Sequence, residues 1–163
     1  MFDDLIAANR SYRDGFTDSG LPGTAARGLA VLTCIDSRID PLRMLGLAPG
    51  DAKIIRNAGA RVTDDALRSL ILATNLLGVT RICVVQHTEC AMAGSTEDDL
   101  RKRIEHLRGA DASSVEFLVM TDQLAALRDD IAKIRACALI ASDTEVGGFT
   151  YDVRTGELVP AAV

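Results

Sequence analysis

The chain has 163 residues, which is enough for one domain with a sizeable core but short for two. Apolar residues make up 48% of it and aromatic residues only 4%, so we expect a folded protein with an aliphatic core. The net charge of −5, without a basic patch, argues against nucleic-acid binding, and no apolar run approaches the ~20 residues that a membrane span needs. We therefore expect a single domain over residues 1–163.

Hydrophobic spacing and turn residues predict helices that alternate with strands along the chain. The expected helices are 2–12, 41–45, 64–77, 91–106 with a break near residue 94, and 122–135. The expected strands are 29–33, 52–56, 81–86 and 136–141, followed by a terminal hairpin or turn over residues 149–159. Residues 115–120 have a strand-like composition but could also form a short helix. This alternation predicts an α/β fold with a mainly parallel β-sheet flanked by helices.

The first helix, residues 2–12, is separated from the rest by a loop rich in glycine. A short isolated helix is only marginally stable in water. We therefore expect it to protrude and to pack either on the core or on another subunit. Asp3 and Asp4 stand where a secretory signal would carry basic residues, so we expect a cytoplasmic protein whose four cysteines are reduced or bound to metal.

An unbroken apolar run, residues 29–32, predicts a strand buried on both faces, and polar side chains follow it at once. Cys34, Asp36 and Arg38 occupy alternate positions, which point the same way in extended backbone. We expect them to converge at the carboxyl end of this strand, where open α/β sheets bind ligands.

A second apolar run, residues 82–85, leads into His87 and Cys90. Together with Cys34 these residues offer two thiolates and one imidazole, a set that suits zinc. These are three obvious ligands, to which Asp36 can be added, so the fourth position would be left to water or to a carboxylate that comes and goes. The sequence therefore predicts a metal site that forms only on folding.

Each residue alone has a simpler interpretation, since a single cysteine is usually a small buried apolar residue and a single histidine is usually a satisfied core residue. The occurrence of both clusters at the ends of buried strands favours the metal site. Cys83 and Cys137, which lie in apolar segments, are expected to be inert core residues, and His106 is expected to be solvated.

Residues 34–38 resemble the Cys-x-Asp-x-Arg motif of the β-class carbonic anhydrases, and residues 87–90 resemble their His-x-x-Cys motif. Residues 56–65 and, more loosely, 148–156 are also similar to this family. The resemblance implies an α/β sheet with an N-terminal helix that wraps a partner subunit, in a homodimer or homotetramer.

For the site, the resemblance implies Zn²⁺ bound by Cys34, His87 and Cys90, with Asp36 and Arg38 as a catalytic dyad. The implied activity is that of a carbonate dehydratase, a zinc lyase in which zinc-bound hydroxide converts carbon dioxide reversibly to bicarbonate. If the dyad breaks, Asp36 can become the fourth zinc ligand and close the site, a state expected to be favoured at lower pH.

Two alternatives stay open on the same residues. The first is a hydrolase of carbonyl sulfide or carbon disulfide on the same scaffold, and the second is a non-catalytic protein that binds zinc or bicarbonate. The chain also departs from the family at Glu89, where aspartate is usual, and at Ala91, where glycine is usual. If position 91 requires a positive φ, alanine adds roughly 1–2 kcal/mol of strain and its methyl group would narrow the pocket.

Overall fold

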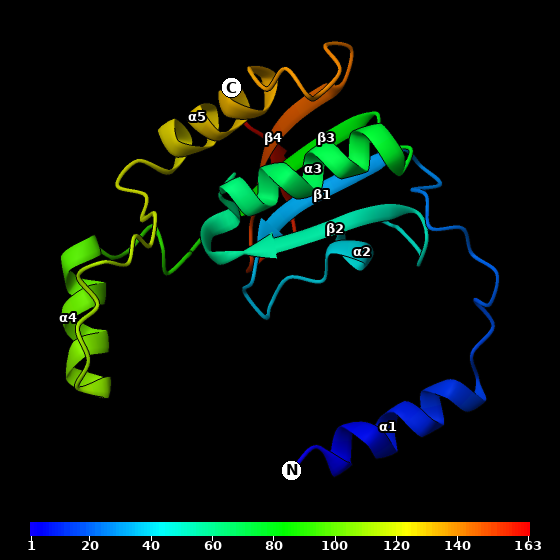
Figure 1. The fold of residues 1–163 in the computed structure, drawn as a ribbon, viewed down its shortest axis with the longest axis horizontal. Helices are drawn as coiled ribbons and strands as arrows, with labels where there is room; N and C mark the ends of the chain where they lie inside the picture. The colour runs from blue at the N-terminus through cyan, green and yellow to red at the C-terminus, as the bar shows by residue number, and fades with distance from the viewer.

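A computed structural model describes residues 1–163 (Figure 1). The helices are α1 (Asp3–Asp14), α2 (Pro41–Met44), α3 (Asp64–Leu76), α4 (Glu97–Arg108) and α5 (Gln123–Arg135), with a 3₁₀ turn at Ala58–Ala60. The strands are β1 (Leu29–Cys34), β2 (Ala52–Asn57), β3 (Arg81–His87), β4 (Glu145–Tyr151) and β5 (Leu158–Pro160). They form one sheet in the order β2-β1-β3-β4-β5, in which only β5 runs antiparallel to its neighbour. The expected α/β fold with a mainly parallel sheet is confirmed.

The sheet buries its central strands most deeply, as the apolar runs predicted. Ala30, Val31 and Leu32 of β1 are wholly buried, and Val84 and Val85 of β3 are as well. Helices α3 and α5 cover one face (Figure 1), where they contribute the largest apolar cluster of the molecule. Strands β1 and β3 are parallel neighbours, so the polar residues that follow each of them emerge at the same edge of the sheet.

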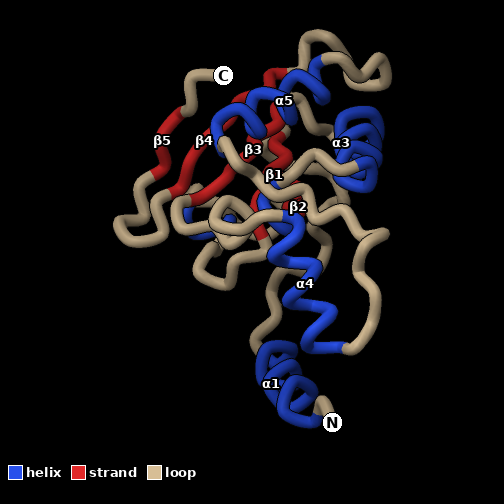
Figure 2. The backbone as a smooth tube through the Cα atoms, turned by 90° about the vertical axis from the view of Figure 1, so that its left-hand side faces the viewer, coloured by secondary structure: helices blue, strands red, loops and turns tan.

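Helix α1 stands away from the sheet and has no buried residue (Figures 1 and 2). Phe2, Leu5, Ile6 and Tyr12 are all more than half exposed. The protruding N-terminal helix is therefore present as expected. No helix combines the length and the apolar character needed to cross a membrane.

The expected strand at residues 136–141 is wrong, because this segment forms turns and β4 begins at Glu145. Ile140 is buried against the core while Leu139 is exposed, so only part of this apolar segment packs inward, from a loop and not from a strand. The hairpin expected over residues 149–159 exists, since Phe149–Tyr151 pair with β5. The earlier part of β4 was not expected, because it contains two glycines and glycine is depleted in strands. At Gly148 an added Cβ would lie 2.7 Å from Ile131 Cδ1, so glycine permits the close approach of β4 to α5.

Two more expectations are corrected between β3 and α5. Residues 91–95 form turns, and only the part of the expected helix after the predicted break exists, as α4, whose N-cap is Thr96. Residues 115–120 are neither strand nor helix. The carboxylate of Glu97 accepts hydrogen bonds from the backbone N–H groups of Phe117 and Val119, which satisfies this segment without a strand neighbour.

The remaining cysteines and the second histidine lie away from the expected metal site. Cys83 is buried in β3, and burial raises the pKa of its thiol to about 12. Cys137 is only partly buried and lies in a turn, so its expected position within a core strand is wrong. His106 is exposed on α4, as expected.

Candidate metal centre

Three predicted ligands meet at the carboxyl edge of the sheet. Cys34 ends β1, His87 ends β3, and Cys90 lies in the turn that follows β3. One ligand atom from each lies within 4.8 Å of the other two, and all three residues are buried. The arrangement brings together residues that are more than fifty positions apart in the sequence because β1 and β3 are parallel neighbours.

The His87 ring is oriented for metal binding through Nε2. Its Nδ1 lies 2.8 Å from the Thr88 carbonyl oxygen, and because a carbonyl only accepts hydrogen bonds, Nδ1 carries the proton. Nε2 therefore presents a lone pair, and this buried atom has no hydrogen-bond partner. A buried polar atom without a partner costs roughly 1–3 kcal/mol, so the ring fits a site in which a metal takes the lone pair.

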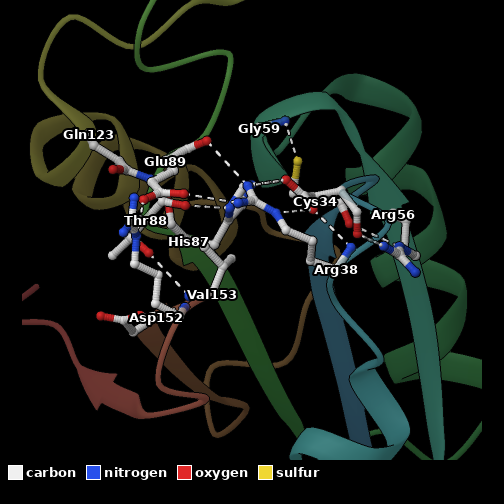
Figure 3. Close-up of polar contacts among 12 residues, drawn as sticks. Cys34, Arg38, Arg56, Gly59, His87, Thr88, Glu89, Gln123, Asp152 and Val153 are labelled. Atoms are coloured by element: carbon white, nitrogen blue, oxygen red, sulfur yellow. Dashed lines mark hydrogen bonds and ion pairs between the residues drawn. The ribbon is translucent and has the colours of Figure 1, made fainter.

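The two thiols also fit a cation between them. The backbone N–H of Gly59 donates to Cys34 Sγ at 3.4 Å (Figure 3). The neighbouring Cys90 thiol, His87 and this N–H hold the pKa of Cys34 well below its ordinary value, and the Cys34 thiolate in turn raises the pKa of Cys90. Two adjacent thiolates repel each other, and a divalent cation would remove that repulsion. One nitrogen and two sulfurs form a donor set that zinc accepts.

Asp36 and Arg38 form a bidentate ion pair beside this cluster. Arg38 donates from Nε to Oδ1 at 3.0 Å and from Nη2 to Oδ2 at 2.7 Å, and its backbone N–H donates to Oδ1 at 2.9 Å. These contacts hold the pKa of Asp36 well below its ordinary value. Asp36 Oδ2 lies 3.9 Å from Nε2 of His87, so the carboxylate is held next to the position that a metal would take.

Arg56 fixes the loop that carries this pair. Its Nε donates to the Cys34 carbonyl oxygen at 2.9 Å and its Nη2 donates to the Asp36 carbonyl oxygen at 2.7 Å (Figure 3). Arg56 begins the segment 56–65, which in the sequence was notable only for its resemblance to a known family, and its side chain has a structural role. It satisfies carbonyl groups that lose their strand partners where β1 ends.

The ion pairs of Glu89 were not expected from the sequence. Its Oε2 accepts from Arg38 Nη1 at 3.0 Å, and its Oε1 accepts from Arg154 Nε. Glu89 also has a positive φ of 58°, whereas Ala91 is not among the residues with positive φ. The strain considered at Ala91 is therefore absent, and the left-handed position of this turn falls two residues earlier.

The turn between β4 and β5 is hydrogen-bonded to the turn after β3 that contains Cys90, which we call the ligand turn. Thr88 N–H donates to the Tyr151 carbonyl oxygen at 3.0 Å, and Val153 N–H donates to Thr88 Oγ1 at 3.1 Å. No sequence pattern linked these segments, which lie more than sixty residues apart. Only the pairing of β3 with β4 places them side by side.

A family model described as carbonic anhydrase matches residues 29–111 of the chain. The protein named β-carbonic anhydrase 1 in Mycobacterium tuberculosis is 37% identical over 157 residues, which cover 96% of this chain and 94% of that protein. A carbon disulfide hydrolase of Acidianus is 35% identical over 162 residues, which cover 85% of this chain and 78% of that protein.

Solved structures give the same relationship. The carbonic anhydrase of Streptococcus mutans superposes with a TM-score of 0.92 at 39% identity, over 98% of this chain and 96% of that one. The apo form of a carbon disulfide hydrolase superposes with a TM-score of 0.78 at 29% identity, over 98% of this chain and 91% of that one.

Proposed function

The chain belongs to the β-class carbonic anhydrase family, and from this membership we propose that it is an enzyme that hydrates carbon dioxide reversibly to bicarbonate and a proton. The observation that carries the proposal is the buried, unpartnered Nε2 of His87 beside two thiols at the carboxyl edge of a parallel sheet. A structural site would use four protein ligands, whereas this cluster offers three and so leaves room for a reactant.

We propose zinc as the metal and Cys34, His87 and Cys90 as its ligands. When bound, zinc supplies a Lewis acid that makes water nucleophilic near neutral pH. The ligand turn supports this chemistry by fixing the His87 ring through the Thr88 carbonyl group, while Gln123 Nε2 donates to the His87 carbonyl oxygen at 2.9 Å.

Asp36 and Arg38 are the proposed catalytic pair. A carboxylate held ionised by arginine accepts hydrogen bonds and does not donate them, so Asp36 can orient the water that adds to carbon dioxide. Arg38 keeps that carboxylate turned toward itself through two parallel N–H donors. If this pair opens, Asp36 is near enough to the proposed metal position to occupy it, which would close the site.

The experiment is metal analysis of the purified protein combined with stopped-flow hydration of carbon dioxide. We expect one zinc per chain, hydration faster than in buffer alone, and loss of the metal in His87→Ala. Asp36→Ala should keep its zinc and lose activity by roughly 10²-fold, the usual contribution of a positioned acid or base. A zinc-loaded wild-type protein no faster than buffer would contradict the proposal and would favour a non-catalytic zinc- or bicarbonate-binding protein.

Hydrolysis of carbon disulfide or carbonyl sulfide is the second candidate, because carbon disulfide hydrolases are among the close relatives. Both reactions add water to a linear, neutral triatomic molecule, so the metal ligands and the Asp36–Arg38 pair would serve either one. Assays of the same zinc-loaded sample with each substrate separate the candidates. A higher kcat/KM for a sulfur substrate than for carbon dioxide would overturn the main proposal.

We propose a homodimer as the working unit. Helix α1 exposes apolar side chains that nothing in its own chain covers, and the sheet face opposite α3 and α5 carries an apolar hollow of about 270 Å³ lined by Leu45, Phe149 and Leu158 among others. Two such surfaces can cover each other when copies exchange their helices. Light scattering should find a dimer for the full chain and a monomer after deletion of residues 1–16.

We also place the protein in the cytoplasm. All four cysteines are free, and the two proposed ligands among them must stay reduced to bind zinc. Cell fractionation with an antibody against the chain tests this placement.

A further inference from the structure

Four charged side chains of alternating sign run outward from the proposed metal centre. Asp36 pairs with Arg38, Arg38 pairs with Glu89, and Glu89 pairs with Arg154 (Figure 3 shows Arg38 reaching toward Glu89). The first two residues follow β1, the third lies in the ligand turn after β3, and the last lies in the turn between β4 and β5. The proposed mechanism uses the first pair and leaves the second unexplained.

Arg154 is placed by an ordered turn, although its side chain is 79% exposed. The carboxylate of Asp152 accepts from the backbone N–H groups of Arg154 at 2.7 Å and Thr155 at 3.0 Å. The next residue, Gly156, has a φ of 78° and donates to the Asp152 carbonyl oxygen at 2.8 Å, which closes the turn. The turn is also bound to the ligand turn through Thr88, so Arg154 and Glu89 face each other across a fixed junction.

Arg38 stands between two carboxylates. Its Nε and Nη2 donate to Asp36, while Nη1 donates to Glu89 at 3.0 Å and Nη2 also lies 3.4 Å from the Glu89 carbonyl oxygen. Glu89 therefore fixes the plane of the guanidinium group, but its negative charge also attracts Arg38 away from Asp36. A cation on the far side of Glu89 offsets that attraction and keeps the anchor in place.

We propose that Arg154 is a positioning residue that neutralises Glu89, so that Glu89 anchors Arg38 without competing with Asp36 for it. Asp36 then stays on Arg38 and away from the fourth metal position. Without Arg154, Glu89 draws Arg38 more strongly, and Asp36 is released toward the metal for a larger share of the time. The inference rests on the proposed metal site, whose existence is tested separately by cobalt uptake of the wild-type chain.

Azide binding to the cobalt-loaded protein tests this role, because azide needs the fourth metal position and changes the visible spectrum of Co²⁺ when it binds. We expect Arg154→Ala to raise the dissociation constant for azide about threefold, a modest factor in keeping with an exposed pair. Arg154→Lys should keep most of the affinity, and the difference should shrink in 1 M salt, where exposed charges are screened.

Two double variants make the reasoning specific. Arg154→Ala combined with Glu89→Gln should bind azide nearly as well as the wild type, because the competing charge is gone. In an Asp36→Ala background Arg154→Ala should have no effect, because no carboxylate remains to enter the metal position. The matched control is Arg68→Ala, which removes another largely exposed arginine, paired with Asp65 on α3, and should leave azide affinity unchanged.

Three outcomes would overturn the inference. The first is unchanged azide affinity in Arg154→Ala, and the second is an equal loss in the Asp36→Ala background, which would show a general effect of charge on anion binding. The third is loss of cobalt from Arg154→Ala, which would show that Arg154 supports the ligands themselves. A wild-type chain that takes up no cobalt would instead refute the proposed metal site.

Discussion

Replacing Gly59 by alanine tests how tightly the backbone around the metal centre is fitted. Gly59 has a φ of 78°, and its N–H donates to Cys34 Sγ at 3.4 Å. An L-residue in this left-handed region costs roughly 1–2 kcal/mol. The position therefore combines a backbone conformation that favours glycine with a hydrogen bond to a proposed metal ligand.

The added methyl group would also meet two methionines. Its Cβ would lie 3.2 Å from Met120 Cε and 3.3 Å from Met92 Cβ. The end of Met120 can rotate away, but Met92 Cβ is fixed to the backbone, and overpacking of this kind costs roughly 1–3 kcal/mol. Reduced freedom of the unfolded chain returns roughly 0.4–1 kcal/mol, so the free energy of unfolding should fall by about 2.5 kcal/mol in all.

Urea unfolding of the metal-free protein measures this loss, and Gly109→Ala is the matched control. Gly109 has a φ of 65° but no atom within 4 Å of its added Cβ, so it reports the backbone cost alone, about 1 kcal/mol. Gly59→Ala should also bind Co²⁺ more weakly than the control, because the donor to Cys34 is displaced. Equal unfolding free energies and equal cobalt affinities in the two variants would refute the reasoning.

Two further predictions concern segments for which the structure expected from the sequence was wrong. The N–H groups of residues 117 and 119 lower the pKa of Glu97, so its contribution to stability is complete above the ordinary value of 4.5 and is lost as pH falls below it. The urea midpoints of wild type and Glu97→Gln should therefore differ at pH 7, and the difference should become smaller at pH 3.5. A difference that is the same at both pH values would contradict this. Ala91→Gly should lower the free energy of unfolding by about 0.4–1 kcal/mol, because residue 91 has no positive φ to relieve, and a gain in stability would show otherwise.

The sheet was predictable where one physical cause dominated. The apolar runs of β1 and β3 are buried from both sides, and a short continuous apolar run is typical of a strand in a parallel sheet. Helix α5 followed from the helical spacing of its apolar residues, three of which are buried in the structure: Leu127, Ile131 and Ile134. Only the end of strand β4 was expected, within the hairpin over residues 149–159. Its earlier part was not, because Gly148 permits the close approach of α5, a contact that only the packed core reveals.

For the site, too, some features were predictable from the sequence and others were not. The residue types and their places at the ends of two apolar runs indicated Cys34, His87 and Cys90, and alternate positions indicated Asp36 with Arg38. The sequence alone therefore determined which chemistry was available. Tertiary structure decided how the site residues are positioned. It pairs Glu89 with Arg154 across 65 residues, and it places the positive φ of the turn at residue 89 and not at residue 91. Contacts between charged side chains so far apart leave no local pattern, because they depend on which strands become neighbours and not on the order of residues along either strand.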